Sequence, residues 1–233
     1  MARRHGRPRL HRVRATARRV RSWALVLPRW TTTTPGAPRR VTVVQSDIVA
    51  STQLLEAAGA EYPRLLVRHR SLIASAVDRR GGSFLTHAGD GTMAVFDAPD
   101  AALLASVEAQ RALAAEPWPE GLAPRVRMSV HAGDVFDIDG EPVGLAINHG
   151  ARIMSVARAG QVIVSPAAAH AAEAGGGVGS GRDGLVVADA GWHELRDHCG
   201  PVRLRQLVGD GLTVVLPASD SDVSAPESTP AGR

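Results

Sequence analysis

Two periods of apolar positions divide the chain into predicted strands and helices. Apolar residues recur every three or four positions across Tyr62–Arg79, the spacing that places them on one face of a helix. Short runs rich in β-branched residues and bounded by turn residues are instead typical of strands. The predicted strands are Val41–Asp47, Ser83–His87, Met93–Phe96, Arg125–Val130, Gln161–Val164, Leu185–Ala188, Trp192–Arg196 and Val202–Leu207. The predicted helices are Ser51–Ala60, Tyr62–Arg79, Pro99–Ala115, Leu145–Arg158 and Pro166–Ala174.

The order of these elements predicts one α+β domain between two tails. Helices and strands interleave with several antiparallel hairpins, which is the pattern of the α+β class. Residues 1–40 have no sustained apolar period, and residues 210–233 are rich in Ser, Pro and Asp. Such segments cannot bury enough apolar surface to fold, so we expect disordered tails around a domain at 41–209.

The charge of the chain is divided unevenly between the first tail and the domain. Residues 1–40 hold 12 arginines and no acidic residue, which leaves 15 arginines against 23 acidic residues in the rest. The net charge of +4 is therefore the sum of a basic arm and an acidic domain. It does not indicate that the domain binds nucleic acid. The arm is either a disordered tail or a segment that binds an anionic membrane or nucleic acid.

Two residue counts exclude further classes. The chain contains no lysine, so the P-loop motif GxxxxGK[ST] is absent. A single cysteine, Cys199, rules out an intrachain disulfide and fits a reducing compartment, so we expect a cytoplasmic protein.

Two aspartates stand where predicted strands end. Asp47 closes an apolar run that starts at Val41, and Asp90 belongs to an Asp-Gly pair between Ser83–His87 and Met93–Phe96, a strong hairpin signal. Carboxylates on neighbouring strand ends can share two divalent cations, an arrangement that suits phosphoryl chemistry. Taken singly, Asp47 could instead cap a helix and Asp90 could serve only the turn.

These residues belong to a series of blocks that resembles a known family. From Val41 to about Leu207, the chain resembles the catalytic domain of the class III nucleotide cyclases, which comprise adenylate and guanylate cyclases. The blocks follow the family's order: Val43–Thr52, Gly81–Phe96, Val126–Asp134, Gly140–Met154 and Gly160–Ser165. The resemblance implies an α+β fold with a ferredoxin-like βαββαβ core and an added C-terminal hairpin. It also implies the conversion of ATP to 3′,5′-cyclic AMP and pyrophosphate.

The resemblance assigns this chemistry to named positions. Asp47, Asp90 and the backbone carbonyl of Ile48 would bind two Mg²⁺ or Mn²⁺ ions. Asn148 and Arg152, four residues apart and hence on one face of a predicted helix, would orient the ribose and stabilise charge on the α-phosphate. In the family the two sets meet across a two-fold interface, which implies a homodimer with two composite sites. Without the resemblance, Asn148 and Arg152 would be an ordinary solvated helix face.

The substrate-binding positions depart from the family pattern. Thr86 stands where adenylate cyclases typically carry lysine, and Glu141 stands where they carry Asp or Thr. Glu141 can still accept a hydrogen bond from the adenine amino group, which favours ATP over GTP. Gln45 replaces the phenylalanine usual two residues before the first metal-binding aspartate. Arg196 either lies near the family's triphosphate-binding basic position or forms a surface ion pair.

Three functions are compatible with this sequence. The first is an adenylate cyclase that works by two-metal catalysis. The alternative, motivated by Thr86 and Gln45, is a catalytically weak or inactive cyclase-homology domain that acts as a nucleotide-binding or regulatory interaction module. A guanylate cyclase is the other reading of the same site.

Overall fold

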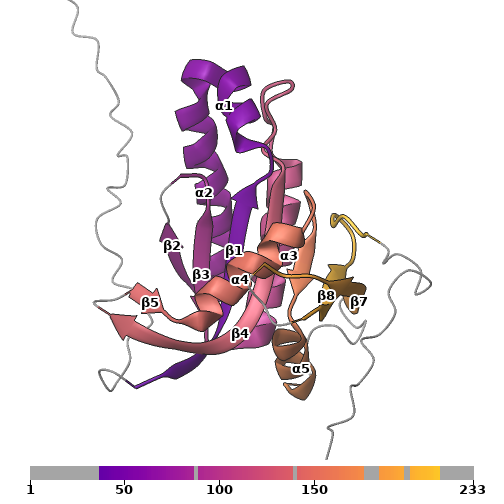
Figure 1. Cartoon of the computed structure of the whole chain (residues 1–233). Coiled ribbons are helices and arrows are strands. Elements are labelled where there is room, and N and C mark those ends of the chain that lie inside the picture. Colours follow the sequence, from indigo (N-terminus) through magenta and orange to yellow (C-terminus); the bar gives the residue numbers. More distant parts are fainter. Residues whose placement is uncertain (1–36, 87–88, 139–140, 176–183, 197–199, 216–233) are drawn as a thin grey trace, which may run out of the picture.

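The structure, a computed structural model, describes residues 37–86, 89–138, 141–175, 184–196 and 200–215 (Figure 1). Most of the two predicted tails, at residues 1–36 and 216–233, lies outside the described residues. In the part of the chain that is described, no helix combines the length and the apolar character that crossing a bilayer requires.

The domain is built on one twisted sheet with the strand order β2-β3-β1-β4-β6-β8-β7, and β5 pairs with β4 alone. The central strand β1 pairs antiparallel with both β3 and β4, whereas β4 and β6 run parallel. The first four strands in this order form the predicted ferredoxin-like core, and β7 and β8 form the predicted C-terminal hairpin. The strands are β1 (Arg39–Ile48), β2 (Ser83–Thr86), β3 (Thr92–Phe96), β4 (Val126–Ile138), β5 (Glu141–Val143), β6 (Val162–Val164), β7 (Val186–His193) and β8 (Val202–Val208).

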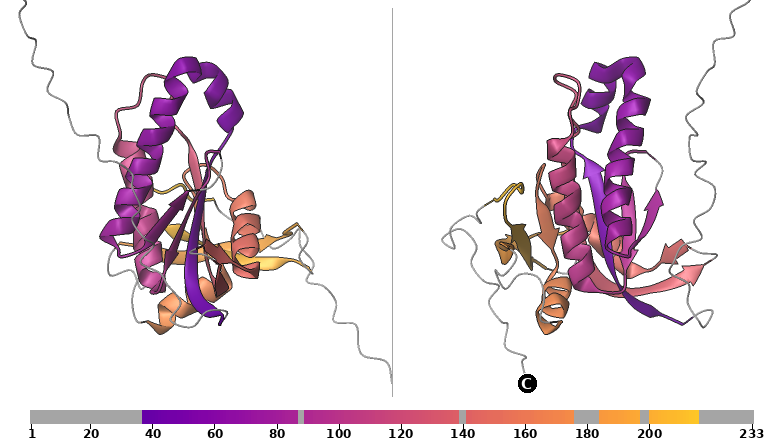
Figure 2. Two further views of the ribbon diagram at one scale, coloured as in Figure 1. Left: turned by 90° about the vertical axis from the view of Figure 1, so that its left-hand side faces the viewer. Right: turned by 180° about the vertical axis from the view of Figure 1, so that it is seen from behind.

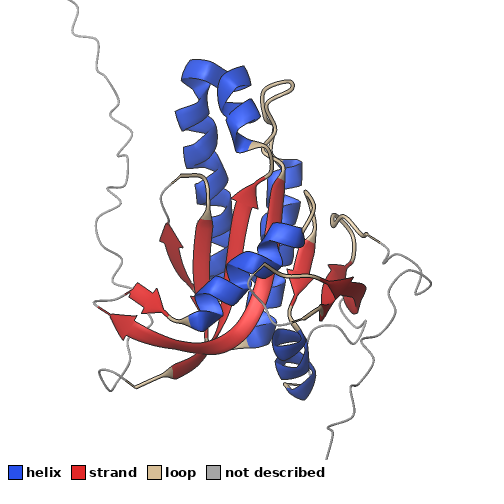
Figure 3. Ribbon diagram, in the orientation of Figure 1, coloured by secondary structure: helices blue, strands red, loops and turns tan. Residues whose placement is uncertain are grey.

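Helices cover both faces of this sheet (Figures 2 and 3). Seen edge-on in Figure 2, α2 and α3 lie on one face and α4 lies on the other. The helices are α1 (Ser51–Ala58), α2 (Tyr62–Arg79), α3 (Pro99–Ala115), α4 (Leu145–Val156) and α5 (Pro166–Ala174), with a short 3₁₀ turn, η1 (Gly59–Glu61), before α2.

Strand β1 is buried on both faces because a helix layer covers each. Val44 and Ile48 belong to the main core cluster with residues of α2 and α3, such as Leu103. Val43, one position out of phase with them, packs in a second cluster with Ala146 of α4. The two-residue period of a strand therefore divides β1 between the two layers. Asp47 lies in phase with Val43, so its side chain belongs to the α4 side of the sheet.

Three of the predictions about strands were wrong. The strand expected to end at Val130 continues to Ile138, where it pairs with β5, an element the sequence reading missed. The strands predicted at Leu185–Ala188 and Trp192–Arg196 are one strand, β7, with an irregularity between Asp189 and Gly191. In each case cross-strand pairing supplies the hydrogen bonds, and local sequence carries little of that information.

A strained backbone connects β1 to the helix that follows. Ala50 has φ 58° and ψ 41°, and it is the one non-glycine residue with positive φ in the described chain. Side chains with a Cβ avoid this left-handed region, at a cost of about 1 kcal/mol or more. The turn is held by Val49, which donates to Arg125 O at 2.7 Å, and by Leu54, which donates to Ala50 O at 3.1 Å. The tight turn sends the chain away from the sheet directly after Asp47.

Candidate functional site

The structure brings Asp90 against the end of β1, next to Asp47. Asp90 lies in the turn between β2 and β3, and its Oδ2 accepts a hydrogen bond from the backbone N–H of Ile48 at 3.1 Å. The two strands are joined just below this point, where Ser46 pairs with Thr92 and their hydroxyl oxygens lie 2.6 Å apart. Both carboxylates therefore stand at the same end of adjacent central strands.

The carboxylate of Asp47 is held by an arginine that the sequence reading did not single out. Oδ2 of Asp47 accepts hydrogen bonds from Nη2 of Arg127 at 2.6 Å and from Nε at 3.1 Å. Arg127 lies directly opposite Asp47 in the β1–β4 register, and its Nη1 also donates to Ser155 O of α4 at 3.2 Å. The alternation of β4 marks Arg127 as a polar position, but only the strand register shows that it meets Asp47.

Helix α2 adds three side chains to the same end of the sheet. Burial raises the pKa of the Tyr62 phenol, and the negative charges of Asp90 and Asp47 raise it further, while Arg70 opposes them. His69 is fully buried, and burial lowers its pKa to about 4 although the charge of Asp90 acts in the opposite direction. Tyr62, His69 and Arg70 thus share one electrostatic neighbourhood with the aspartates.

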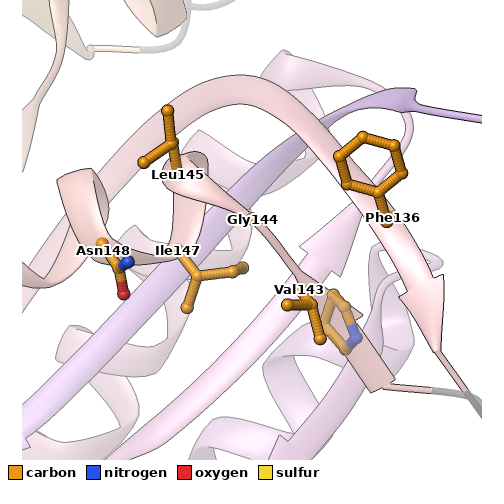
Figure 4. A pocket seen from close by; sticks show the side chains of 7 residues that line it. Phe136, Val143, Gly144, Leu145, Ile147 and Asn148 are labelled. Carbon is orange, nitrogen blue, oxygen red and sulfur yellow. The ribbon is translucent and has the colours of Figure 1, made fainter.

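Asn148 and Arg152 lie on successive turns of α4. Asn148 is exposed and lines a shallow, mostly apolar hollow of about 400 Å³ (Figure 4). Phe136, Val143 and Leu145 line the same hollow, and their exposed fractions of 43%, 44% and 71% are high for large apolar residues. Arg152 is half-buried, one turn further along the helix. Asn148, the residue predicted to orient the ribose, therefore lies beside an uncovered apolar surface, and Arg152 is not among the residues that line it.

The helix segment between these two residues sits very close to β1 and β4. Gly150 accepts a hydrogen bond at its carbonyl from Oγ of Ser129 at 2.8 Å. A Cβ placed on Gly150 would lie 2.5 Å from Oε1 of Gln45, a buried oxygen with no hydrogen-bond partner among the described residues. Gln45, the departure from the family's phenylalanine, is thus a polar support under α4, and glycine at 150 makes room for it.

The remaining predicted positions are spread along the sheet. Thr86 ends β2 and pairs with Thr92 of β3. Glu141 is exposed and opens β5. Arg196 is exposed in the turn after β7, directly after Leu195, which belongs to the buried cluster that contains Ile153 of α4.

The oxygen donors present fit a hard divalent cation. Within the described ranges there is no group of three or more His, Cys, Asp and Glu side chains that could hold a metal. A cation here would therefore be bound by the two carboxylates and a backbone carbonyl, with other oxygens from water or phosphate. Mg²⁺ typically binds in this way, through one or two carboxylates plus substrate phosphates.

Comparisons with known proteins identify the fold. No family model matches the chain. A Rhizobium meliloti (strain 1021) protein named "Putative adenylate cyclase 3" is 25% identical over 169 residues, covering 71% of this chain and 28% of that protein. An uncharacterized protein of Mycobacterium tuberculosis (strain ATCC 25618 / H37Rv) is 28% identical over 194 residues, covering 81% of this chain and 62% of that protein. The chain thus spans less than two thirds of the length of these curated relatives.

The chain covers a larger share of several solved structures than of these curated relatives. An adenylate/guanylate cyclase/hydrolase from Silicibacter pomeroyi superposes with a TM-score of 0.60 at 26% identity, covering 75% of this chain and 99% of that one. An adenylate cyclase from Trypanosoma brucei in its monomeric state gives 0.62 at 24% identity, covering 72% and 87%. The guanylate cyclase domain of RhGC from Catenaria anguillulae in complex with GTP gives 0.61 at 17% identity, covering 74% and 98%. The chain has the α+β catalytic-domain fold of the class III nucleotide cyclases, so the resemblance read from the sequence is confirmed.

Proposed function

We propose that this chain is a class III nucleotide cyclase that converts ATP to 3′,5′-cyclic AMP and pyrophosphate. The observation that carries the proposal is the hydrogen bond from the Ile48 N–H to Asp90, which holds the second carboxylate beside Asp47. Folding alone requires no such pairing of two acidic residues at one strand end, where their like charges repel. A site that binds cations makes use of it.

Asp47, Asp90 and the carbonyl of Ile48 are the groups that would hold two Mg²⁺ or Mn²⁺ ions. When bound, these ions would lower the pKa of the ribose 3′-hydroxyl and neutralise the charge that develops on the phosphates. The chain itself supplies the fixed geometry. Strand pairing positions Asp47, and the Ile48 N–H orients Asp90 through a charge-assisted hydrogen bond.

Arg127 would have a different partner depending on whether Asp47 holds a cation. Its guanidinium neutralises Asp47 in the structure through two hydrogen bonds to one oxygen. The same oxygen of Asp47 would be needed to hold a cation, and Arg127 would then bind a substrate phosphate, for which a guanidinium fork is well suited. Arg196 would add a second positive charge on the triphosphate, and Thr86 and Glu141 would contact the base.

Asn148 and Arg152 act on the site of a second copy of the chain. Asn148 would orient the ribose, and Arg152 would stabilise charge on the α-phosphate. The exposed apolar surface of Phe136, Val143 and Leu145 lies beside Asn148, so covering it with a partner would also deliver Asn148 to that partner's aspartates. Each active site of the homodimer would therefore need residues from both copies of the chain.

A product assay tests the proposal. Purified full-length protein is incubated with ATP or GTP and Mn²⁺, and the products are identified by mass spectrometry. We expect cyclic AMP, and we expect Asp47→Asn, Asp90→Asn and Arg152→Ala each to remove nearly all of the activity. Asp97→Asn is the matched control, because Asp97 is an exposed carboxylate at the end of β3 that pairs with Arg39. A folded, dimeric protein that forms no cyclic nucleotide from either substrate would refute the cyclase function.

The dimer has its own test. Leu145→Asp places a charge on the most exposed residue of the apolar surface, and we expect it to yield a folded, inactive monomer in light scattering. Mixing it with Asp47→Asn should not restore activity. Mixing Arg152→Ala with Asp47→Asn should, because that pair can assemble one intact composite site.

A second candidate function is a cyclase-homology domain that binds nucleotide without turnover. The ion pair between Arg127 and Asp47 favours it, because it occupies an oxygen that a cation needs. This alternative predicts nucleotide binding by calorimetry with no cyclic product under any metal. Recovery of activity in Arg127→Met would show that the arginine restrains the site.

A further inference from the structure

The turn that carries Asp90 is held from two sides. On one side the backbone N–H of Ile48 donates to Asp90 Oδ2 at 3.1 Å. On the other side Nη2 of Arg70, from the middle of α2, donates to the carbonyl of Gly89, the residue directly before Asp90. The turn therefore connects strand β1 to helix α2 through one residue on each side of the Gly89–Asp90 peptide bond.

The packing of α2 fixes the direction in which Arg70 points toward this turn. His69 precedes it and has no exposed surface, and both of its ring nitrogens lack partners among the described residues. Because burial holds its pKa at about 4, the ring is neutral near pH 7 and acts as a packing group. Rotating α2 would expose His69 or drive Arg70 away from the turn, so packing fixes the direction of Arg70.

The contact made by Arg70 leaves the carboxylate oxygens of Asp90 available to other ligands. Arg70 hydrogen-bonds the main chain of the turn, and the described residues contain no ion pair between it and Asp90. Arg127, in contrast, binds the carboxylate of Asp47 directly. The Nε of Arg70 is buried without a hydrogen-bond partner in the described chain. A buried N–H without a partner costs free energy, so a gain in stability alone does not account for the position of Arg70.

We propose that Arg70 is a positioning residue for the cation site: it fixes the Gly89 carbonyl so that Asp90 meets Asp47, without competing for the carboxylate oxygens. This inference rests on the proposed function, since it assumes that Asp90 binds a metal. It adds a group from α2, outside the residues that would touch metal or substrate.

The test measures Mn²⁺ binding and activity in three variants of the full-length chain. Arg70→Ala removes the donor, and Arg70→Lys keeps a cation with a single point of contact. Arg68→Ala is the matched control, because Arg68 lies two residues earlier on α2 and binds Glu116 at 2.6 Å. Mn²⁺ binding is followed by the electron paramagnetic resonance signal of free Mn²⁺, without nucleotide. Circular dichroism and thermal unfolding check that each variant is folded.

We expect the dissociation constant for Mn²⁺ to rise about tenfold in Arg70→Ala, a loss of roughly 1.4 kcal/mol, and to change less than twofold in Arg68→Ala. Arg70→Lys should recover part of the affinity. In the activity assay, the Mn²⁺ concentration for half-maximal rate should rise in Arg70→Ala while kcat at saturating Mn²⁺ falls less than threefold. A residue that only supports the fold would lower kcat and thermal stability without this separation.

Asp90→Asn separates the two ways in which the inference can fail. If Asp90→Asn loses Mn²⁺ binding but Arg70→Ala binds as tightly as the unchanged chain, the metal site stands and the role of Arg70 is refuted. If Asp90→Asn also binds as tightly as the unchanged chain, Asp90 is no metal ligand, and both proposals are overturned. Equal weakening by Arg70→Ala and Arg68→Ala would likewise contradict a specific role for Arg70.

Discussion

The contact between Gln45 and Gly150 gives a prediction that can be worked through in free energy. In an exposed helix, Gly→Ala stabilises by about 1 kcal/mol, because alanine has the higher helix propensity. At position 150 the new Cβ would lie 2.5 Å from Oε1 of Gln45, well inside the 3.4 Å at which ordinary contact begins. Overpacking of a buried site typically costs about 1–3 kcal/mol. We therefore expect Gly150→Ala to be neutral to about 2 kcal/mol destabilising.

Removing the opposing side chain should reverse the sign. In the background of Gln45→Ala the clash is gone, so Gly150→Ala should stabilise the protein by about 1 kcal/mol. The double-mutant cycle then yields a coupling energy of about 1–3 kcal/mol between Gln45 and Gly150, in the range found for residues in direct contact. Ala151→Gly, on the exposed side of the same helix turn, calibrates the propensity difference at this point in α4.

Urea unfolding of the four proteins of the cycle measures this coupling, provided that their m-values agree. Product formation measured on the same samples links the packing to the site. Gly150→Ala should lower activity, because it pushes the turn between Asn148 and Arg152 away from the sheet, and Gln45→Ala should restore it. Additive free energies, with a coupling below about 0.3 kcal/mol, would refute the reasoning that Gln45 and Gly150 are matched.

Three further predictions concern stability. Ala50→Gly should stabilise the domain by about 1 kcal/mol in urea unfolding, because glycine adopts the left-handed conformation of residue 50 without strain; a loss of stability would contradict this. The pKa of His69 is about 4 in the folded protein, below the ordinary value of 6.5 for an unburied histidine, so the unfolded chain takes up the proton first as the pH falls. Stability should therefore drop by about 3 kcal/mol as the pH falls from 6.5 to about 4, and His69→Leu should flatten that part of the pH profile; an unchanged profile would mean that the ring is not held neutral. Ser165→Ala should cost about 1 kcal/mol, because Oγ of Ser165 accepts the hydrogen bond from the Ala168 N–H that caps α5, and Ser165→Asp, which can still accept it, should cost less.

Much of the architecture was determined by the sequence alone. The helical period of Tyr62–Arg79 and the β-branched run after Val41 predicted α2 and β1, because local backbone preference and burial agree there. The turn residues around Asp90 predicted the hairpin of β2 and β3, although the residue with positive φ in that turn is Gly89 and not Gly91. The short strand β5 was not predicted, because it has three residues and its strand hydrogen bonds come from pairing with β4.

What only the tertiary structure decided is which side chains meet. The sequence marked Asp47 and Asp90 as strand-end carboxylates, but the Ile48 N–H that orients one and the Arg127 guanidinium that holds the other come from different strands. Gln45 stood out in the sequence only as a replacement for phenylalanine, and the packing of α4 on it at Gly150 gives it a structural role. Contacts of this kind depend on strand register and helix packing, which join residues far apart along the chain, and no local period encodes such pairings.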